Sequence, residues 1–354
     1  MSPYITFIVA TAISYLMTPL TIRLATKYKL ITDANSRSHP AHTHTGIIPR
    51  GGGIPIYASL LITGLFFLPM HKIVIGILIS NAFLLILGLL DDRFDLSPYL
   101  RFIINITISS MVVLFGIGIP YISNPFGGVI RLDFWKLSFD IFGMRSILVF
   151  ADIVAVIWLT WTMNMVNWSK GVDGQLPGFV AITAFFLGLL SQRFIGHNIQ
   201  AETVMQLSFI VAGAYAGFIP FNFYPQRIMP GYGGGAMAGF LLGILAILSF
   251  GKVGTALLIL SIPMIDAVYA IIRRLGKKSS PFRADWGHFH HKLLEIGWGK
   301  RRIAVFYWLI SFILGLTSLF LTGLEKFFAF VTMGIALFTF IIIINRMKKV
   351  DVVK

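Results

Sequence analysis

The chain has 354 residues, of which 56% are hydrophobic and only 12% are charged, and its mean hydropathy is +0.83. A soluble globule of this size needs more polar surface than these residues supply, which excludes a soluble enzyme or binding domain. Cysteine is absent, which excludes disulfides, thiolate nucleophiles and cysteine-ligated metals. The composition therefore predicts an all-α integral membrane protein, which we interpret as a single polytopic domain over residues 1–354.

Eleven apolar stretches are long enough for membrane spans, which take about 17 to 25 helical residues. Lipid offers no partner for unpaired backbone groups, so each stretch is expected to form a helix. The first is interpreted as a span rather than a cleaved signal peptide, because no basic residue precedes it and no small-residue cleavage site ends it. The stretches lie near residues 3–24, 52–70, 73–90, 102–119, 146–166, 176–192, 203–219, 236–250 (which is short), 253–272, 303–321 and 326–345.

Basic residues predict the orientation of these spans. With the N-terminus outside and the C-terminus in the cytoplasm, 22 of the 29 Lys and Arg residues fall on the inner side, where such residues usually collect. The net charge of +15 is therefore mostly a topology signal, and we expect no nucleic-acid partner. An inner face rich in cations also attracts anionic lipids of the bilayer and anionic substrates.

This orientation places the polar segments that are rich in Gly, His or acidic residues on the cytoplasmic side. The largest outer loop, 121–145, alternates aromatic and charged residues and is expected to form an interfacial hairpin or an amphipathic segment. One face of the protein is therefore expected to hold the chemistry. The cytoplasmic loops expected to form the active site are 43–53, 91–98, 164–178, 230–235 and 273–302.

Asp91 and Asp92 stand side by side where the apolar run 73–90 ends, in a chain with only 14 acidic residues. Carboxylates at the edge of a bilayer cost free energy unless they meet cations, water or substrate. Together with Asp95 they could hold Mg²⁺ or accept a proton. The alternative is a solvated helix end in which Arg93 is the partner of the acids.

Asn164 and Asn167 lie one helical turn apart at the end of a span, which suits hydrogen bonding to a polar ligand. Asparagine also joins membrane helices to one another, so a packing role is the alternative. Asp173 lies between Gly171 and Gly174, which permit a tight turn that a ligand can approach. Its carboxylate could bind that ligand or cap the turn.

The glycine-rich run 231–235 resembles a phosphate-binding loop only loosely, because it lacks the Lys and the Ser or Thr of a P-loop. The alternative is a flexible loop that leads into a helix. In that helix, Gly235 and Gly239 would permit close packing against a neighbour.

The histidines His288, His290 and His291 could bind a metal ion or a phosphate. No sulfur or carboxylate ligand stands at metal-binding spacing from them, and Arg283 is near, so anion contact is favoured over zinc. A solvated, weakly basic loop is the alternative. Asp266 lies in the middle of a span and needs a partner in the bundle or at the site.

The order of these motifs is more specific than any one of them. Their series on alternate cytoplasmic loops resembles the polyprenyl-phosphate N-acetylhexosamine-1-phosphate transferases (glycosyltransferase family 4) over nearly the whole chain. The undecaprenyl-phosphate N-acetylglucosamine-1-phosphate transferase type is favoured over the muramyl-pentapeptide branch by Pro-Arg-x-Gly-Gly at 49–53, Asp-Asp-Arg-Phe-Asp at 91–95 and His-x-His-His at 288–291.

The resemblance implies phosphoryl-sugar transfer at the inner membrane surface. Polyprenyl phosphate attacks the sugar-linked phosphorus of a UDP-sugar, giving polyprenyl-diphospho-sugar and UMP. It also implies a multi-pass protein of the inner (cytoplasmic) membrane, a Mg²⁺ cofactor, a homodimer, and a base that is Asp91 or Asp92. The substrate-binding residues that it implies are Arg50, Asn164, Asn167, Asp173, Arg283, His288, His290 and His291.

Two positions depart from the family's pattern. Lys170 stands where the Asn-rich motif normally continues with an Asp, and Tyr232 stands where the glycine loop normally carries the Asp that ligates Mg²⁺. An ammonium in place of a carboxylate reverses the charge of a metal site, and the second change removes a direct ligand. The acids that remain for Mg²⁺ are Asp91 and Asp92, and Lys170 joins them as a candidate catalytic residue.

Three functions are consistent with these departures. In the first, the Lys170 ammonium replaces the metal cation in an active transferase. In the second, Lys170 pairs with Asp91 or Asp92 and leaves a lipid- or nucleotide-binding regulatory protein. In the third, the same cavity serves a transporter, which the intramembrane residues Asp152 and Asp266 permit. We expect the first of these, a phosphoglycosyltransferase.

Overall fold

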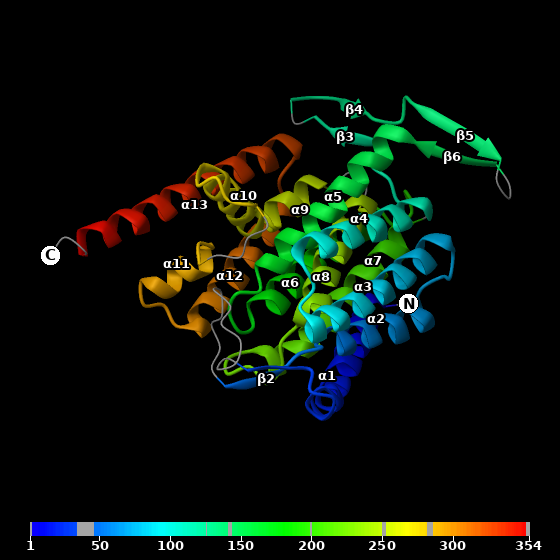
Figure 1. Cartoon of the computed structure of the whole chain (residues 1–354). Helices are drawn as coiled ribbons and strands as arrows, with labels where there is room; N and C mark the ends of the chain where they lie inside the picture. The colour runs from blue at the N-terminus through cyan, green and yellow to red at the C-terminus, as the bar shows by residue number, and fades with distance from the viewer. Residues whose placement is uncertain are drawn as a thin grey trace.

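The computed structural model describes residues 2–33, 46–124, 126–140, 144–198, 200–249, 253–281 and 286–351, and within these the protein is a bundle of helices (Figure 1). Every apolar stretch expected to be helical contains at least one helix. The helices are α1 (Pro3–Lys27), α2 (Gly53–Phe67), α3 (Lys72–Phe94), α4 (Pro98–Leu114), α5 (Val149–Trp168), α6 (Gln175–Gln192), α7 (Ala201–Asn222), α8 (Gly231–Leu248), α9 (Val253–Ile259), α10 (Ser261–Gly276), α11 (Phe289–Glu295), α12 (Lys300–Ser318) and α13 (Gly323–Asp351).

The strands form small antiparallel hairpins outside the helical body. Two of them lie between residues 121 and 148, which confirms the expectation of a hairpin in the 121–145 loop. The second, formed by β5 (Lys136–Asp140) and β6 (Met144–Leu148), projects away from the bundle (Figure 1). The third hairpin, β1–β2, lies between α1 and α2 with Thr32 opposite Ile48. The strands are β1 (Ile31–Asp33), β2 (Ile47–Pro49), β3 (Tyr121–Ser123), β4 (Val129–Arg131), β5 (Lys136–Asp140) and β6 (Met144–Leu148).

The lengths of the helices confirm an all-α multi-pass membrane protein. Among the described residues, 8 helices are long and apolar enough to cross a membrane, and α2 and α4 are shorter apolar helices. The stretch expected at 253–272 divides into α9 and α10 at Leu260. Pro263 explains the break, because it has no N–H to bond the carbonyl of Ile259. The number of eleven spans and the placement of the termini stay predictions.

The glycine-rich run 231–235 is the first turn of α8, so the loop expected there is wrong. For the same reason the span expected to be short begins five residues before 236. The glycines allow α8 to pack closely on its neighbours: a Cβ on Gly88 of α3 would lie under 3.0 Å from the backbone of Gly233, and one on Gly239 would meet the backbone of Thr162 in α5. Packing against other helices, which local propensity does not include, therefore makes this run helical.

Gly88→Ala is expected to lower the thermal midpoint of the detergent-solubilised protein. The new methyl group would push α3 away from Gly233, and overpacking of this kind costs about 1–3 kcal/mol. Gly64→Ala in α2 is the matched control, because its nearest contact would be an ordinary one, 3.6 Å from Leu78. Equal midpoints for the two variants, measured by tryptophan fluorescence, would argue against the close contact between α3 and α8.

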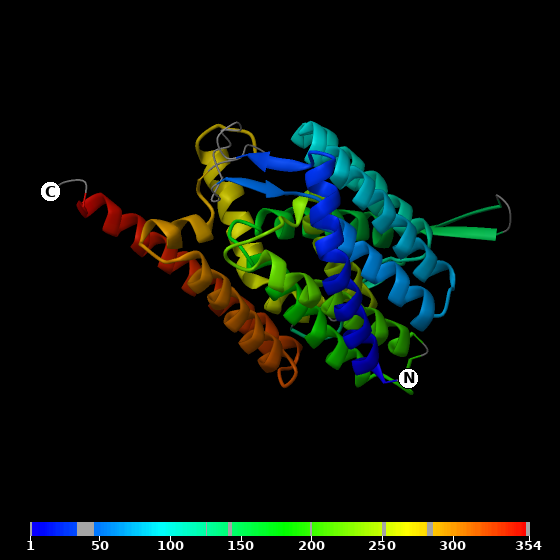
Figure 2. The ribbon, with the colours of Figure 1, turned by 90° about the horizontal axis from the view of Figure 1, so that it is seen from below.

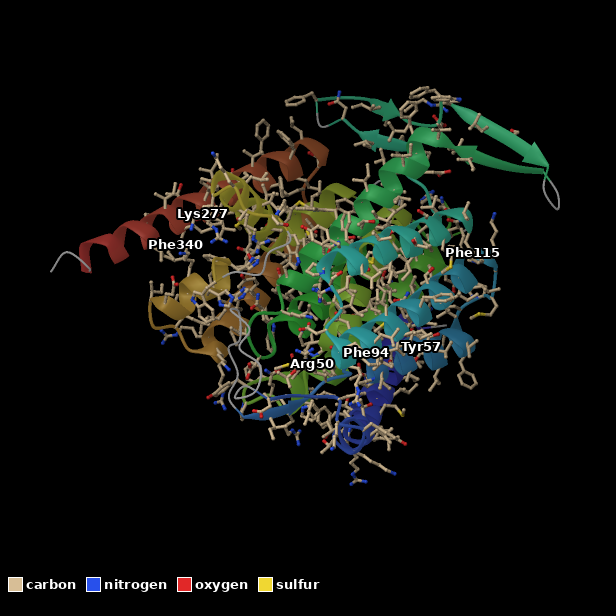
Figure 3. All side chains as sticks on the ribbon, in the orientation of Figure 1. Arg50, Tyr57, Phe94, Phe115, Lys277 and Phe340 are labelled. Atoms are coloured by element: carbon tan, nitrogen blue, oxygen red, sulfur yellow. The ribbon has the colours of Figure 1, made fainter. Side chains whose placement is uncertain are left out.

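The polar segments gather at one end of the bundle. In Figure 2, β1, β2 and the turn between α3 and α4 lie toward the top of the view, and the N-terminus lies at the bottom. Figure 3 places Arg50 and Phe94 at one end of the layer formed by α2, α3 and α4, and Phe115 at the other. The guanidinium of Arg93 donates to the carbonyl of Tyr28 at 3.2 Å, which ties the end of α3 to the end of α1.

Candidate active site

Asp91 lies in the last turn of α3 and is paired with the next helix. Asp95 ends α3 in the left-handed conformation (φ 51°), and Ser97 caps α4 by accepting from the N–H of Leu100. This turn places Arg101 beside Asp91, and its Nη1 donates to the two carboxylate oxygens at 3.1 and 3.2 Å. Asp91 is buried, with only 4% of its surface exposed. The alternative interpretation, in which Arg93 is the partner of the acids, is wrong, because that guanidinium donates to carbonyls at the end of α1.

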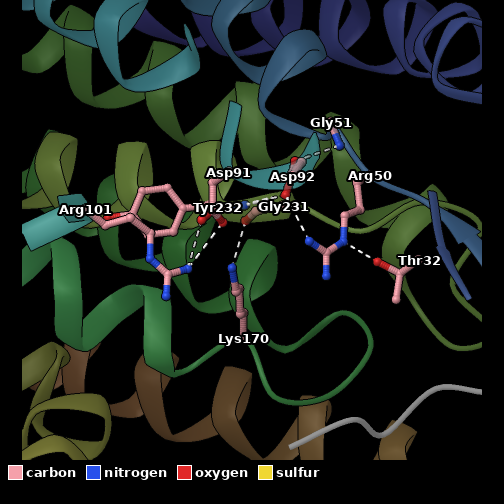
Figure 4. A network of polar contacts seen from close by, with 9 residues as sticks. All are labelled: Thr32, Arg50, Gly51, Asp91, Asp92, Arg101, Lys170, Gly231 and Tyr232. Carbon is pink, nitrogen blue, oxygen red and sulfur yellow. Dashed lines mark hydrogen bonds and ion pairs between the residues drawn. The ribbon is translucent and has the colours of Figure 1, made fainter. Parts of the chain in front are cut away.

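Asp92 faces the start of α8. Its Oδ1 accepts from the backbone N–H of Tyr232 at 3.2 Å, and its Oδ2 accepts from the N–H of Gly51 at 3.2 Å (Figure 4). The guanidinium of Arg50 lies 3.6 Å from Oδ1 and also donates to the hydroxyl of Thr32. A carboxylate at a helix N-terminus satisfies an otherwise unpaired N–H and interacts favourably with the helix dipole. Asp92 therefore joins α3, the start of α2 and α8.

Lys170 follows α5 and points at the same place from the opposite side (Figure 4). Its ammonium donates to the carbonyl of Gly231 at 2.9 Å and lies 5.8 Å from the ring centre of Tyr232. Within the described part of the chain it forms no ion pair within 4.0 Å with Asp91 or Asp92. Burial lowers the pKa of Lys170 to about 8, against the opposing attraction of Asp92 and Asp91.

Tyr232, which the sequence predicts to replace an acid of the family's pattern, contacts α4 and two cations of the site. Its hydroxyl accepts a hydrogen bond from Nδ2 of Asn105 at 2.8 Å, so the side chain is fixed against α4. The guanidinium of Arg101 lies 5.2 Å from the ring centre, and the ammonium of Lys170 approaches the ring at a similar distance. Cations within about 6 Å of an aromatic ring are attracted to it. The ring therefore helps to hold two of the cations of the site.

These residues do not fit a divalent metal ion. Within the described ranges, no group of three or more His, Cys, Asp and Glu side chains is arranged to hold one. The oxygens of Asp91 accept from Arg101, and those of Asp92 accept from two backbone N–H groups beside Arg50. Arg101 and Arg50 already pair with the two carboxylates, and a Mg²⁺ ion normally takes six oxygen ligands in octahedral geometry.

The two asparagines and Asp173 differ in how the fold uses them. Nδ2 of Asn164 donates to the carbonyl of Thr160 in its own helix, while Oδ1 of Asn167 is buried without a hydrogen-bond partner among the described residues. Asp173 accepts from Gln226 and from the ammonium of Lys300 at 3.3 Å. Asp173 therefore belongs to a second polar group and not to the Asp91–Asp92 pair.

The histidines form a third polar group around Asp266. Nδ1 of His288 lies 3.0 Å from the Asp266 carboxylate, and Nε2 lies 3.2 Å from a guanidinium nitrogen of Arg274. Because Arg only donates, Nε2 accepts and Nδ1 carries the proton. Asp266 also accepts from the N–H of Phe289 at 2.7 Å, which supplies the partner that its sequence position required. Arg283 lies outside the described residues.

His290 is buried and neutral. Burial, with the neighbouring His291 and His288, lowers the pKa of His290 well below its usual value. Its Nδ1 is buried without a hydrogen-bond partner in the described part of the chain. At neutral pH it can therefore bind an anion by donating a hydrogen bond, but not as a cation.

The segment after α5 brings the three groups together. A Cβ on Gly171 would overlap the ring of His290, so that ring packs directly on the backbone next to Lys170. The ring of Trp168 lies under the guanidinium of Arg274, with a separation of 5.5 Å. Lys170 and Asp173 therefore reach the acidic pair and the Lys300 group from one short turn, while its backbone contacts the histidines.

The comparison with known proteins identifies the family. The sequence profile described as "Glycosyl transferase family 4" matches residues 74–250, which is half of the chain. The chain belongs to glycosyl transferase family 4. The matched family segment contains the acidic pair, both asparagines, Lys170 and the start of α8.

Similar proteins of this family span most of the chain. A probable undecaprenyl-phosphate N-acetylglucosaminyl 1-phosphate transferase of Bacillus subtilis is 27% identical and covers 97% of this chain and 90% of its own length. A decaprenyl-phosphate N-acetylglucosaminephosphotransferase of Mycobacterium leprae is 27% identical over 85% of this chain and 79% of its own. The undecaprenyl-phosphate alpha-N-acetylglucosaminyl 1-phosphate transferase of Escherichia coli K12 is 28% identical over 80% and 74%.

Three residues of the site were missed by sequence reasoning. Arg101 is a basic residue in the first turn of an apolar helix, and this position was a usable signal that it faces the acids. Asn105 lies one turn further along the same helix and binds Tyr232. Lys300 gave no signal, because nothing in the sequence relates it to Asp173 across 127 residues.

Proposed function

We propose that this protein transfers a sugar-1-phosphate, an N-acetylhexosamine-1-phosphate, from a UDP-sugar to polyprenyl phosphate. An oxygen of the lipid phosphate bonds to the phosphorus that carries the sugar. The bond from that phosphorus to the oxygen shared with the uridine phosphate breaks, and UMP leaves. Membership of glycosyl transferase family 4 supports this reaction, as do the names of the three relatives above.

The observation that carries the proposal is the set of cations around Asp91 and Asp92 at the ends of apolar helices. Transfer between two phosphates brings negative charges together, so catalysis depends on positioning and neutralising them. Arg50, Arg101 and Lys170 are proposed to attract the phosphates. A lipid substrate reaches this place from the bilayer, and a UDP-sugar reaches it from water.

The two acids are proposed to have different roles. Asp91 has one partner, Arg101, and its oxygens keep lone pairs free for the last proton of the lipid phosphate. Asp92 is engaged by two backbone N–H groups and Arg50, so it is proposed as a positioning residue. Asn167, whose Oδ1 lacks a partner in the described residues, and neutral His290 are proposed to bind the nucleotide.

Location and assembly follow from the same reasoning. The chain is a multi-pass membrane protein, and the inner (cytoplasmic) membrane is proposed because a UDP-sugar is a cytosolic substrate. The homodimer stays a prediction. We infer no step through Mg²⁺, because the donors around Asp91 and Asp92 do not fit it.

The experiment is a donor screen with the purified, detergent-solubilised protein. Undecaprenyl phosphate is incubated with radiolabelled UDP-GlcNAc or UDP-GalNAc, with Mg²⁺ or with EDTA, and UMP and labelled lipid are measured. UMP released in equal amount to labelled lipid is the expected result. Binding of UDP-sugar without UMP release from any donor would replace the transferase with the regulatory function. Entry of the intact UDP-sugar into liposomes, with no UMP formed, would favour a transporter.

A further inference from the structure

The Lys170 ammonium is the cation of the site that no carboxylate neutralises directly. Asp91 is paired with Arg101, and Asp92 lies beside Arg50. An ammonium has three N–H donors, and Lys170 uses one of them on the carbonyl of Gly231. Within the described residues the other two have no acceptor, so a third anion would find donors and charge here.

The contacts of Lys170 do not match the alternative in which it pairs with Asp91 or Asp92 and inactivates the site. That alternative requires an ion pair between the ammonium and one of the two carboxylates, and in the described part of the chain no such ion pair lies within 4.0 Å. The two carboxylates are already held by Arg101, Arg50 and backbone N–H groups. Lys170 is therefore not needed to neutralise them.

Lys170 and Tyr232, the two residues expected to depart from the family's pattern, lie near one another. The ammonium of Lys170 lies 5.8 Å from the ring centre of Tyr232, within the range of attraction between a cation and an aromatic ring. Asn105 fixes that ring through its hydroxyl, at 2.8 Å. The second departure thus supplies a surface that holds the cation introduced by the first.

The surroundings of Lys170 offer further groups for a diphosphate. The neighbouring residue Gly171 is covered by the ring of His290, whose Nδ1 lacks a hydrogen-bond partner in the described part of the chain. The guanidinium of Arg101 also lies near the Tyr232 ring, 5.2 Å from its centre. A diphosphate next to Lys170 would meet the compact charge of its ammonium, the planar guanidinium of Arg101 and the neutral ring of His290 as a hydrogen-bond donor.

We propose that in this chain the Lys170 ammonium, held by Gly231 and Tyr232, binds the diphosphate of the nucleotide sugar in place of a divalent metal ion. This inference rests on the proposed function for the identity of the ligand. It makes Lys170 a diphosphate-binding residue and predicts that neither binding nor turnover requires a metal.

The first test measures binding of UDP-GlcNAc by calorimetry in EDTA. The wild type is expected to bind, Lys170→Met to bind at least about tenfold more weakly, and Lys170→Arg to retain binding because it keeps the charge. Wild-type affinity in Lys170→Met would overturn the inference. A matched control is Lys136→Met on the projecting β5–β6 hairpin, which is expected to bind as the wild type does.

The second test measures metal binding directly with Mn²⁺ and electron paramagnetic resonance. With or without UDP-GlcNAc, the wild type is expected to give the same Mn²⁺ signal as the corresponding mixture without protein. The double variant Lys170→Asp, Tyr232→Asp restores two carboxylates and is expected to bind Mn²⁺ and to need it for UDP-GlcNAc binding. Tight Mn²⁺ binding by the wild type would overturn the inference.

The pH dependence of UDP-GlcNAc affinity tests whether the charge of Lys170, and not only its place in the fold, is needed for binding. With a pKa of about 8, Lys170 is an ammonium below that pH and a neutral amine above it, so affinity is expected to fall about tenfold from pH 7 to pH 9. Asp91, Asp92, Arg50 and Arg101 face the same ammonium. Lys170→Arg leaves them in place and stays charged, so it is expected to lose the slope. A slope that persists in Lys170→Arg would contradict the role of Lys170.

These results are distinguishable from those that test the reaction. If UDP-GlcNAc binds through Lys170 without metal but no UMP is released, the inference about Lys170 stands and the transferase function is wrong. If EDTA abolishes UMP release and Lys170→Met does not change it, the transferase function stands and the inference about Lys170 is wrong.

Discussion

Asp91→Asn is expected to lower the rate of UMP release by about 10²-fold, the low end of the range for removal of a general base. The lipid phosphate must enter a site beside two buried carboxylates. Burial and the like charge of these carboxylates both favour the protonated form of the phosphate. Asp91 is proposed to take the remaining proton, which an amide cannot do. The measurement is the initial rate of UMP release from UDP-GlcNAc at neutral pH.

A change of pH tests the reason for this loss. The deficit of Asp91→Asn is expected to be largest at low pH and to shrink as the pH rises, because solvent then removes the proton from the phosphate. Asp133→Asn is the control, since Asp133 lies between β4 and β5 and pairs with Arg131 at 2.8 Å, and it is expected to show the wild-type rate. A wild-type rate for Asp91→Asn across the whole pH range would remove Asp91 from the chemistry.

The helices could be predicted from the sequence because long apolar runs have few alternatives in lipid. The first turn of α8 could not, since a run of four glycines among five residues has low helix propensity. What makes it helical is the close approach of Gly88 in α3 and Asn167 in α5, together with the carboxylate of Asp92 at its start. Such contacts join residues far apart in the chain and leave no local pattern.

The site could be predicted in part for a similar reason. Asp91, Asp92 and Asp266 stand out because a carboxylate in or beside an apolar helix needs a partner. Which partner it finds depends on the fold: the sequence suggested Arg93, but a turn at Asp95 brings Arg101 to Asp91 instead. Asp173 was expected among the substrate-binding residues, and the structure pairs it with Lys300, at the start of α12.

Lys170 shows where the sequence was informative and where the structure was needed. A lysine at a position where the sequence resemblance implies an Asp predicted a change in the charge of the site. Two arrangements satisfied that prediction: Lys170 paired with Asp91 or Asp92, or an open cation, meaning a Lys170 ammonium without a carboxylate partner. The hydrogen bond to Gly231 and the ring of Tyr232 favour the open cation, because they hold the ammonium while leaving two of its donors without an acceptor among the described residues.

Asp92→Ala is expected to destabilise the protein by about 3–5 kcal/mol, the range for breaking a buried ion pair. The change removes the acceptor for the N–H groups of Gly51 and Tyr232 and leaves Arg50 without its carboxylate. Buried donors without partners add to the loss. The measurement is the free energy of unfolding in mixed detergent and dodecyl sulfate micelles, followed by tryptophan fluorescence.

Asp91→Ala is the matched comparison, because it removes the adjacent carboxylate from the same helix turn. Asp91 has a single side-chain partner, Arg101, which is 25% exposed and can turn to water, so a smaller loss of stability is expected. The pair of variants therefore separates a positioning acid from a reacting one. If Asp92→Ala unfolds with the same free energy as Asp91→Ala and is the less active of the two, Asp92 is the base and Asp91 only anchors Arg101.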